Sequence, residues 1–244
     1  MTRTAIIAAM PGELKPLVRG WQHTRSNGVD LWRSDGCIAA CAGTGVSAAA
    51  QAFTEAEKLG PIDKVISTGW AGALTENLKP GQAYRVSGVI DARTGERFFA
   101  QDVPENPLFA CTPKYTHSAQ RSNPDLWLVT SATVASKAEK QRLASTTPAS
   151  LVDMEAAAIA RLAAARGIPF YCVKGVSDGY RDQLPDFNRF ISSAGRFQLA
   201  RFVLFVLPRP CYWPALARMG ENSKKAARAI AVSLLDLLAA LRPD

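Results

Sequence analysis

The sequence lacks the spacing of metal ligands. Its five cysteines form no CxxC pair, and neither of its two histidines stands at a ligand-like interval from them. Structural zinc sites take their ligands from closely spaced pairs of these residue types. We therefore predict neither a metal site nor a bound cofactor.

Long apolar runs are also missing. The C-terminal run at residues 197–207 has eleven residues, whereas a helix needs about 20 apolar residues to cross a bilayer. The first run, residues 4–10, is too short for a secretory signal with its cleavage site, and it predicts a first buried strand instead. We expect a cytoplasmic protein whose thiols are reduced.

The net positive charge is concentrated at one end of the chain. The formal net charge is +8, but residues 196–244 alone carry eight basic and three acidic side chains. The rest of the chain is close to balanced, which argues against a nucleic-acid-binding protein. Any anionic surface is expected to meet the C-terminal region.

The remaining pattern predicts an α/β fold. Short apolar runs, each followed by small residues, are typical of buried strands, and alanine-rich helices are expected between them at residues 46–59 and 154–166. The second helix is closed by Gly167 and Pro169, as helix C-termini commonly are. We predict one catalytic domain, residues 1–195, of three α/β/α layers, with strands at 5–10, 37–42, 65–68, 126–129 and 170–176.

Residues 91–125 contain four prolines and little periodicity. We interpret them as an irregular surface excursion without chemistry.

Residues 196–244 form an apolar and basic extension, predicted to be helical. The apolar run 197–207 precedes two proline-containing stretches and an alanine-rich helix from about Asn222 to Leu241. One interpretation is a core helix followed by a tail that packs on the catalytic domain. The other is an interfacial element at the inner face of a membrane, whose aromatic and leucine side chains enter the headgroup region beside Arg and Lys.

Four small-residue loops are predicted at strand ends, where open α/β sheets collect ligands. They are Met10–Glu13, Gly43–Gly45, Gly69–Gly72 and Ser177–Gly179. Gly43-Thr44-Gly45 leads into a helix, so it is either a simple tight turn or a cradle for an anion or a sugar hydroxyl.

Two carboxyl groups are candidates for chemistry, each with a plainer alternative. Glu155 follows Val152-Asp153-Met154 at a helix start, where Asp153 would cap the helix and Glu155 would complement its dipole. A carboxylate there can also accept hydrogen bonds from vicinal ribose hydroxyls. Asp178 is either an ordinary turn residue or a general acid held at a strand end.

Together, these segments resemble the purine nucleoside phosphorylase and nucleosidase superfamily, over about residues 4–190. The opening Ile6–Leu14 is similar to the start of the 5'-methylthioadenosine/S-adenosylhomocysteine nucleosidase branch, with Glu13 at the catalytic position. The resemblance implies a central mixed sheet, Asp178 as the general acid at purine N7 with Ser177 supporting it, and Glu155 beside Met154 on the ribose. The other implied substrate-binding residues are Gly43, Thr44, Gly45, Trp70, Gly72 and Thr133.

The C-terminal extension resembles that of one subgroup, the hopanoid-associated phosphorylases that remove adenine from adenosylhopane, whereas the nucleosidase branch normally stops before such an extension. The tail, with Pro208-Arg209-Pro210 and Trp213-Pro214, is similar to the tails of that group. Trp70 stands where the family commonly has a small residue, so its indole either fills the sugar pocket, lines an enlarged apolar route or packs in the core. The substrate is thus expected to be a small, 5'-substituted purine nucleoside, with a lipid-linked one as the sharper prediction.

The nucleophile stays open. Glu13 favours water, whereas phosphorylases bind inorganic phosphate as a co-substrate, for which Arg33, Arg85 and Arg121 are available. A catalytically silent nucleoside- or lipid-binding module is the alternative of another class. A homodimer is the expected assembly.

Overall fold

A computed structural model of the chain describes residues 3–102, 126–182, 185–192 and 197–241. Within these ranges one mixed sheet runs in the order β2-β3-β4-β1-β5-β10-β9-β7-β8, and β11 pairs with β5 and β6. The mixed sheet is as predicted. Its strands are β1 (Thr4–Ala8), β2 (Gln22–Ser26), β3 (Val29–Ser34), β4 (Cys37–Cys41), β5 (Lys64–Ala73), β6 (Ala83–Arg85), β7 (Gly88–Asp91), β8 (Arg97–Phe99), β9 (Trp127–Thr130), β10 (Ala149–Asp153) and β11 (Phe170–Asp178).

The long strand β5 is the branch point of the sheet. It pairs in parallel with β1 and β11 and antiparallel with β10. The prediction of loops at Gly69–Gly72 and Ser177–Asp178 was wrong, because β5 and β11 stay paired through these residues, up to Asp178 opposite Gly72. Ladder pairing on both sides overrides the low strand propensity of glycine there.

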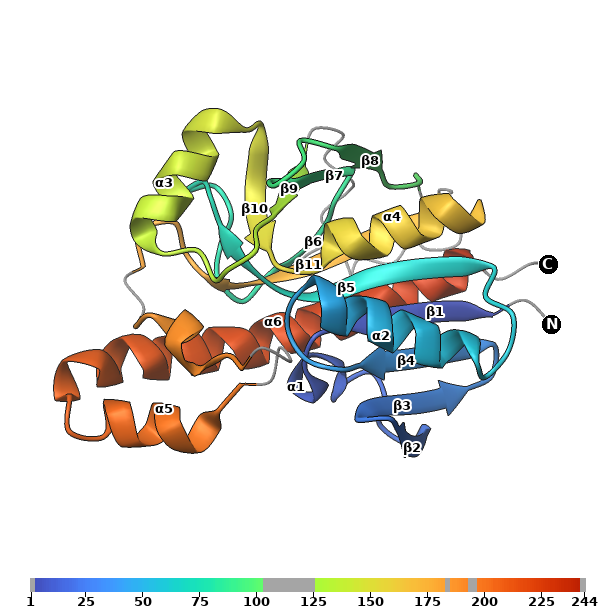
Figure 1. The fold of residues 1–244 in the computed structure, drawn as a ribbon, viewed down its shortest axis with the longest axis horizontal. Coiled ribbons are helices and arrows are strands. Elements are labelled where there is room, and N and C mark those ends of the chain that lie inside the picture. Colours follow the sequence, from blue (N-terminus) through green and yellow to red (C-terminus); the bar gives the residue numbers. More distant parts are fainter. Residues whose placement is uncertain (1–2, 103–125, 183–184, 193–196, 242–244) are drawn as a thin grey trace, which may run out of the picture.

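Helices cover both faces of the sheet, which confirms the three predicted layers (Figure 1). On one face α2 (Val46–Glu57) and α4 (Ala156–Arg166) pack against each other, and on the other α1 (Pro11–Leu14) packs against α6 (Trp213–Ala240). The helix α4 ends at Gly167, whose left-handed φ of +64° fits the predicted stop. The helix α3 (Lys137–Thr146) packs on β10.

The C-terminal region divides into two parts. The apolar run forms α5 (Leu199–Val206), which packs against η2 (Phe187–Phe190). The short helix η3 (Pro210–Tyr212) then leads into α6. The helix α6 begins at Trp213 rather than near Asn222, since Pro214 is compatible with a first helical turn. In Figure 1, α5 and the first turns of α6 extend beyond the sheet.

The second half of α6 belongs to the core, but α5 does not. Ile230, Leu234 and Leu237 are buried, and a Cβ on Gly175 of β11 would lie 2.8 Å from Ile230, so helix and strand touch through a glycine. In α5 only Val206 is buried. The interpretation of residues 197–207 as a core helix was therefore wrong.

The predicted excursion at 91–125 is regular at its start. There β8 forms an antiparallel hairpin with β7. Residues 103–125, including Arg121, lie outside the described residues.

None of the described helices combines the length and the apolar character that a membrane span requires.

Candidate active site

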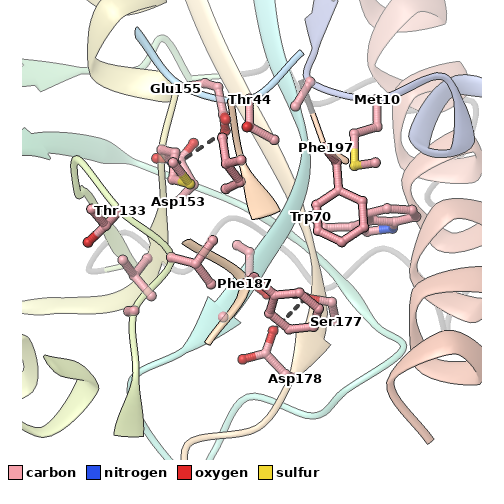
Figure 2. Close-up of a pocket in the computed structure, with 18 of the residues that line it drawn as sticks. Met10, Thr44, Trp70, Thr133, Asp153, Glu155, Ser177, Asp178, Phe187 and Phe197 are labelled. Carbon is pink, nitrogen blue, oxygen red and sulfur yellow. Dashed lines mark hydrogen bonds between the residues drawn. The ribbon is translucent and has the colours of Figure 1, made fainter. Parts of the chain in front are cut away.

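A cavity of about 260 Å³ gathers most of the predicted site residues. It lies where β5, β10 and β11 end, under η2 and the first part of α6. Figure 2 shows Glu155 and Thr44 on one side, Asp178 and Ser177 on another, and Met10, Trp70 and Phe197 on a third. Among the predicted residues it is lined by Glu13, Thr44, Trp70, Gly72, Thr133, Met154, Glu155, Ser177 and Asp178.

The two remaining predicted residues, Gly43 and Gly45, do not line this cavity. Gly43 lines an adjoining hollow of about 190 Å³ with Arg25. Gly45 reaches the site indirectly, because its backbone N–H donates to Glu155 Oε1 at 2.7 Å. That amide, at the start of α2, thus binds a side-chain carboxyl group of the protein itself.

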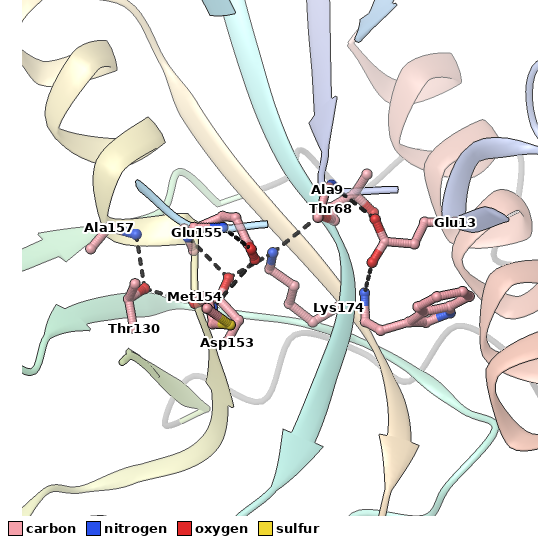
Figure 3. A network of polar contacts seen from close by, with 12 residues as sticks. Ala9, Glu13, Thr68, Thr130, Asp153, Met154, Glu155, Ala157 and Lys174 are labelled. Atoms are coloured by element: carbon pink, nitrogen blue, oxygen red, sulfur yellow. Dashed lines mark hydrogen bonds and ion pairs between the residues drawn. The ribbon is translucent and has the colours of Figure 1, made fainter. Parts of the chain in front are cut away.

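Glu13 is held by three backbone N–H groups. Ala9 and Met10 donate to Oε2 at 2.9 and 2.8 Å, and Trp70 donates to Oε1 at 2.8 Å (Figure 3). Burial raises the pKa of Glu13, although these hydrogen bonds oppose the shift. The carboxyl group is fixed in direction and partly desolvated, as a general base for a water molecule should be.

The close approach of Glu13 to β5 requires a glycine. A Cβ on Gly69 would lie 2.9 Å from Glu13 Oε1, and Gly69 has a φ of +125°. Residues other than glycine rarely adopt this backbone conformation. Gly69 therefore allows the carboxyl group of Glu13 to lie close against β5.

Glu155 is buried at the end of β10 and precedes α4. Its side chain makes no capping bond to α4, so helix capping does not explain it. Burial raises its pKa to about 8, and the neighbouring charge of Asp153 adds to the shift. Asp153 has the capping role instead, because Oδ2 accepts from the backbone N–H of Ala156 at 2.9 Å.

Lys174, in the middle of β11, balances these carboxyl groups. It is fully buried, lies 2.8 Å from Asp153 Oδ2 and donates to the carbonyl of Thr68 at 3.1 Å (Figure 3). Burial opposes its charge, but Asp153, Cys172 and Glu155 together outweigh burial and raise the pKa of Lys174. The ammonium group is therefore a fixed positive charge behind the site.

Asp178 lies at the opposite side of the cavity, at the end of β11. Ser177 Oγ donates to its Oδ1 at 2.6 Å, as the predicted supporting role requires (Figure 2). The ammonium group of Lys140, from α3, contacts Oδ2 and donates to the carbonyl of Gly179 at 2.8 Å. Asp178 thus forms a buried ion pair.

Trp70 packs against the core and also lines the cavity. Its indole N–H donates to the carbonyl of Ser223 in α6 at 3.1 Å, and the ring packs with the core on that face. The same residue lines the cavity, next to Met10, Phe197 and Met219. This side of the cavity is apolar.

Sequence reasoning missed both lysines. Lys174 carried a signal, because it interrupts the apolar strand segment 170–176. Lys140 carried none, since it lies on a helix 38 residues before its partner Asp178. Of the proposed phosphate ligands, Arg33 and Arg85 do not line the cavity. Within the described residues no group of three side chains is arranged to hold a metal ion.

Comparisons with known proteins identify the family and the fold of the chain. The model of the phosphorylase superfamily matches residues 3–204. No curated protein sequence matches the chain.

Solved structures share the fold over the whole chain. A mutant of the Helicobacter pylori nucleosidase MTAN with 5'-methylthioadenosine in its active site has a TM-score of 0.68 at 16% identity, covering 99% of this chain and 100% of that one. Futalosine hydrolase of the same organism has a TM-score of 0.70 at 17% identity and 98% coverage of both chains. The Arabidopsis thaliana 5'-methylthioadenosine nucleosidase has a TM-score of 0.70 at 17% identity, covering 100% of this chain and 98% of that one.

The family match covers most of the chain and agrees with the superfamily that the motifs predicted. The chain therefore belongs to the phosphorylase superfamily, an assignment that confirms the predicted enzyme class of nucleoside phosphorylases and nucleosidases.

Proposed function

We propose that the protein cleaves the N-glycosidic bond of a 5'-substituted purine nucleoside and releases adenine. The observation that carries this proposal is the convergence of Glu13, Glu155 and Asp178 on one cavity from three separate parts of the chain. A site that only binds a nucleoside needs no carboxyl group in each of these three positions. A catalytically silent module is therefore the weaker alternative.

The roles of the three groups follow from the charge that develops as the bond breaks. The C1'–N9 bond gives its electron pair to the purine, and the ribose gains oxocarbenium character. Asp178, positioned by Ser177, delivers a proton to purine N7, and Glu155 binds the 2' and 3' hydroxyls of the ribose. General acid catalysis of this kind contributes about 10²–10⁴-fold in rate.

Water is the proposed nucleophile. Glu13 lines the cavity, and its carboxyl group is held by three backbone N–H groups rather than by a cation in hydrogen-bond contact. It would accept the proton of the water molecule whose oxygen bonds to C1'. Phosphorolysis is the second candidate, because Arg25 lines a hollow that shares Met10, Thr44 and Phe197 with the cavity.

The 5' substituent is proposed to be large and apolar. Met10, Trp70, Phe197 and Met219 line the cavity together, a lining suited to a thioether or hydrocarbon group. A lipid-linked nucleoside such as adenosylhopane fits this chemistry, and 5'-methylthioadenosine is the smaller alternative. We also propose a homodimer, which light scattering would test against a monomer.

The outer face of α5 is proposed to rest on an anionic membrane surface. Leu199, Leu204 and Leu207 are more than 60% exposed, and Arg201 and Arg209 are exposed on the same segment. The face thus combines apolar side chains with basic ones, which is the composition of interfacial helices.

The inner face of α5 connects this surface to the cavity. Phe202 of α5 stacks on Phe187 at a ring distance of 5.3 Å, and Phe187 lines the cavity. A lipid-linked substrate would enter from the bilayer along this aromatic cluster. Vesicle sedimentation tests the contact: we expect binding to anionic vesicles that weakens with salt, and equal binding to neutral vesicles would contradict it.

A substrate panel tests the reaction itself. Adenosine, 5'-methylthioadenosine, S-adenosylhomocysteine and adenosylhopane are incubated with the protein, with and without inorganic phosphate. We expect adenine to be released without phosphate and fastest from a substrate with an apolar 5' group. Release only with phosphate would establish phosphorolysis, and no base from any substrate would contradict the proposed function.

A further inference from the structure

We propose that Lys140 supplies the proton that Asp178 passes to the purine. This inference rests on the proposed function and adds a second residue to its acid step. Lys140 acts through Asp178, because it provides the proton that this carboxyl group transfers to the base. Neither the motifs nor the family resemblance pointed to this residue.

The hydrogen bonds of Asp178 show why a separate proton source is needed. Both carboxylate oxygens already accept, Oδ1 from the Ser177 hydroxyl and Oδ2 from the Lys140 ammonium group. A carboxylate in an ion pair carries no proton of its own. The donor in contact with Oδ2 does carry one.

Lys140 is built into the site rather than placed at the surface. Its side chain is 2% exposed, and its only other hydrogen bond within the described residues goes to the carbonyl of Gly179. Among the described residues that line the cavity, it is the only one with a cationic side chain. Lys140 is therefore the ammonium group that is placed to donate a proton to Asp178.

The space for this pair depends on Gly72 of β5. A Cβ there would lie 3.1 Å from both Asp178 Oδ2 and Lys140 Cε. The two side chains therefore meet directly over a glycine, with no intervening side chain. This direct contact allows a proton to pass from Lys140 Nζ to Asp178 Oδ2 without an intervening group.

The C1'–N9 bond breaks and its electron pair goes to the purine, while the proton moves from Nζ to Oδ2 and from Oδ2 to N7. Lys140 is left as a neutral amine. The oxygen of water bonds to C1', and Glu13 takes a proton from that water. Glu13 then releases this proton to the solvent, and Lys140 takes up one proton from the solvent.

Lys140→Arg separates proton supply from simple charge neutralisation. The guanidinium group can keep the ion pair, but it does not give up a proton in proteins. Single-turnover cleavage is measured on the purine nucleoside that the wild type cleaves fastest. We expect a loss of about 10²-fold or more, while calorimetry gives an adenine Kd close to that of wild type.

A second substrate checks that the loss concerns the leaving group. The phenolate of p-nitrophenyl β-D-ribofuranoside leaves without a proton, so Lys140→Arg should lose far less rate on this substrate than on the purine nucleoside. Lys137→Met, an exposed lysine one turn earlier on α3, is the matched control and should match wild type on both substrates.

The outcomes separate the two proposals. Wild-type rates on the purine nucleoside in Lys140→Arg would overturn the role of Lys140 in proton supply. An equal loss on both substrates, with unchanged circular dichroism, would overturn it as well. A wild-type protein that cleaves no purine nucleoside would instead contradict the proposed function.

Discussion

The carboxyl groups of the cavity and the apolar side chains of α5 differ in what surrounds them. Glu13, Asp153 and Asp178 are buried, and each accepts at least two hydrogen bonds or ion pairs from fixed groups of the chain. Leu204 and Leu207 of α5 are 71% and 63% exposed. The first region is completed by the protein itself, whereas the second offers a surface for something else.

Because their surroundings differ, the two regions should respond differently to substitution. A buried polar network loses several interactions when one member is removed, because the remaining groups stay desolvated. An exposed apolar face loses nothing within the folded chain. Changes in the cavity should therefore affect stability and rate, and changes on α5 should affect only binding to a partner.

The largest effect on stability is expected from Lys174→Met. It leaves the buried carboxyl group of Asp153 without its positive partner, which should lower the free energy of unfolding by about 3–5 kcal/mol. Urea denaturation measures the loss. Lys137→Met removes an exposed lysine and serves as the control; equal, small losses in both variants would contradict the importance of the buried network.

Gly69→Ala should move Glu13 and lower the rate. Displacement of a reacting group by about 1 Å can cost on the order of 10²-fold in rate. Gly95→Ala is the matched control, because Gly95 also has a positive φ, +73°, but open space around its Cβ position. Steady-state kinetics should show the loss only in Gly69→Ala, and an equal loss in both would assign it to backbone strain alone.

The pH dependence of nucleoside binding should report Glu155. The ionised carboxylate accepts hydrogen bonds from both ribose hydroxyls. In the free protein, however, a pKa of about 8 keeps the Glu155 carboxyl group protonated at lower pH. The affinity for the nucleoside should therefore rise with pH up to about 8, by at most about tenfold per pH unit. Calorimetry with a non-cleavable nucleoside measures the slope, and a slope that persists in Glu155→Gln would contradict this assignment.

The smallest effect on the enzyme is expected from Leu204→Glu on α5. Stability should change by less than about 0.5 kcal/mol, as for most surface substitutions, and activity on a soluble nucleoside should be unchanged. Association with anionic vesicles should fall. Leu235→Glu, another exposed leucine at 57%, is the control, and an equal fall in both variants would remove the special role of α5.

Local signals in the sequence predicted much of the fold. Apolar runs marked β1, β4, β5, β9 and β11 but not the buried strands β7 and β10, and Gly167 marked the end of α4, because burial and helix termination leave local traces. The ends of β5 and β11 were misjudged, since glycines at 69 and 72 indicate a loop unless the pairing of the two strands is known. The start of α6 was misplaced for a similar reason, as Pro214 indicates a break in isolation.

The site was predictable where it rests on motifs. Glu13, Glu155 and Asp178 follow strands in a family-like order, and the structure brings them to one cavity. The ion pair of Lys140 with Asp178 joins residues 38 positions apart, and no motif contains both. Contacts of this kind depend on how α3 packs over the sheet, which no local pattern encodes.

The most direct test of the central claim compares wild type with Asp178→Asn. Free adenine released from a 5'-substituted adenosine is quantified by chromatography under single-turnover conditions. We predict adenine from the wild type and a rate lower by about 10²–10⁴-fold in the variant, with binding of the nucleoside retained. Equal rates in the two proteins, or no adenine from the wild type, would contradict the account.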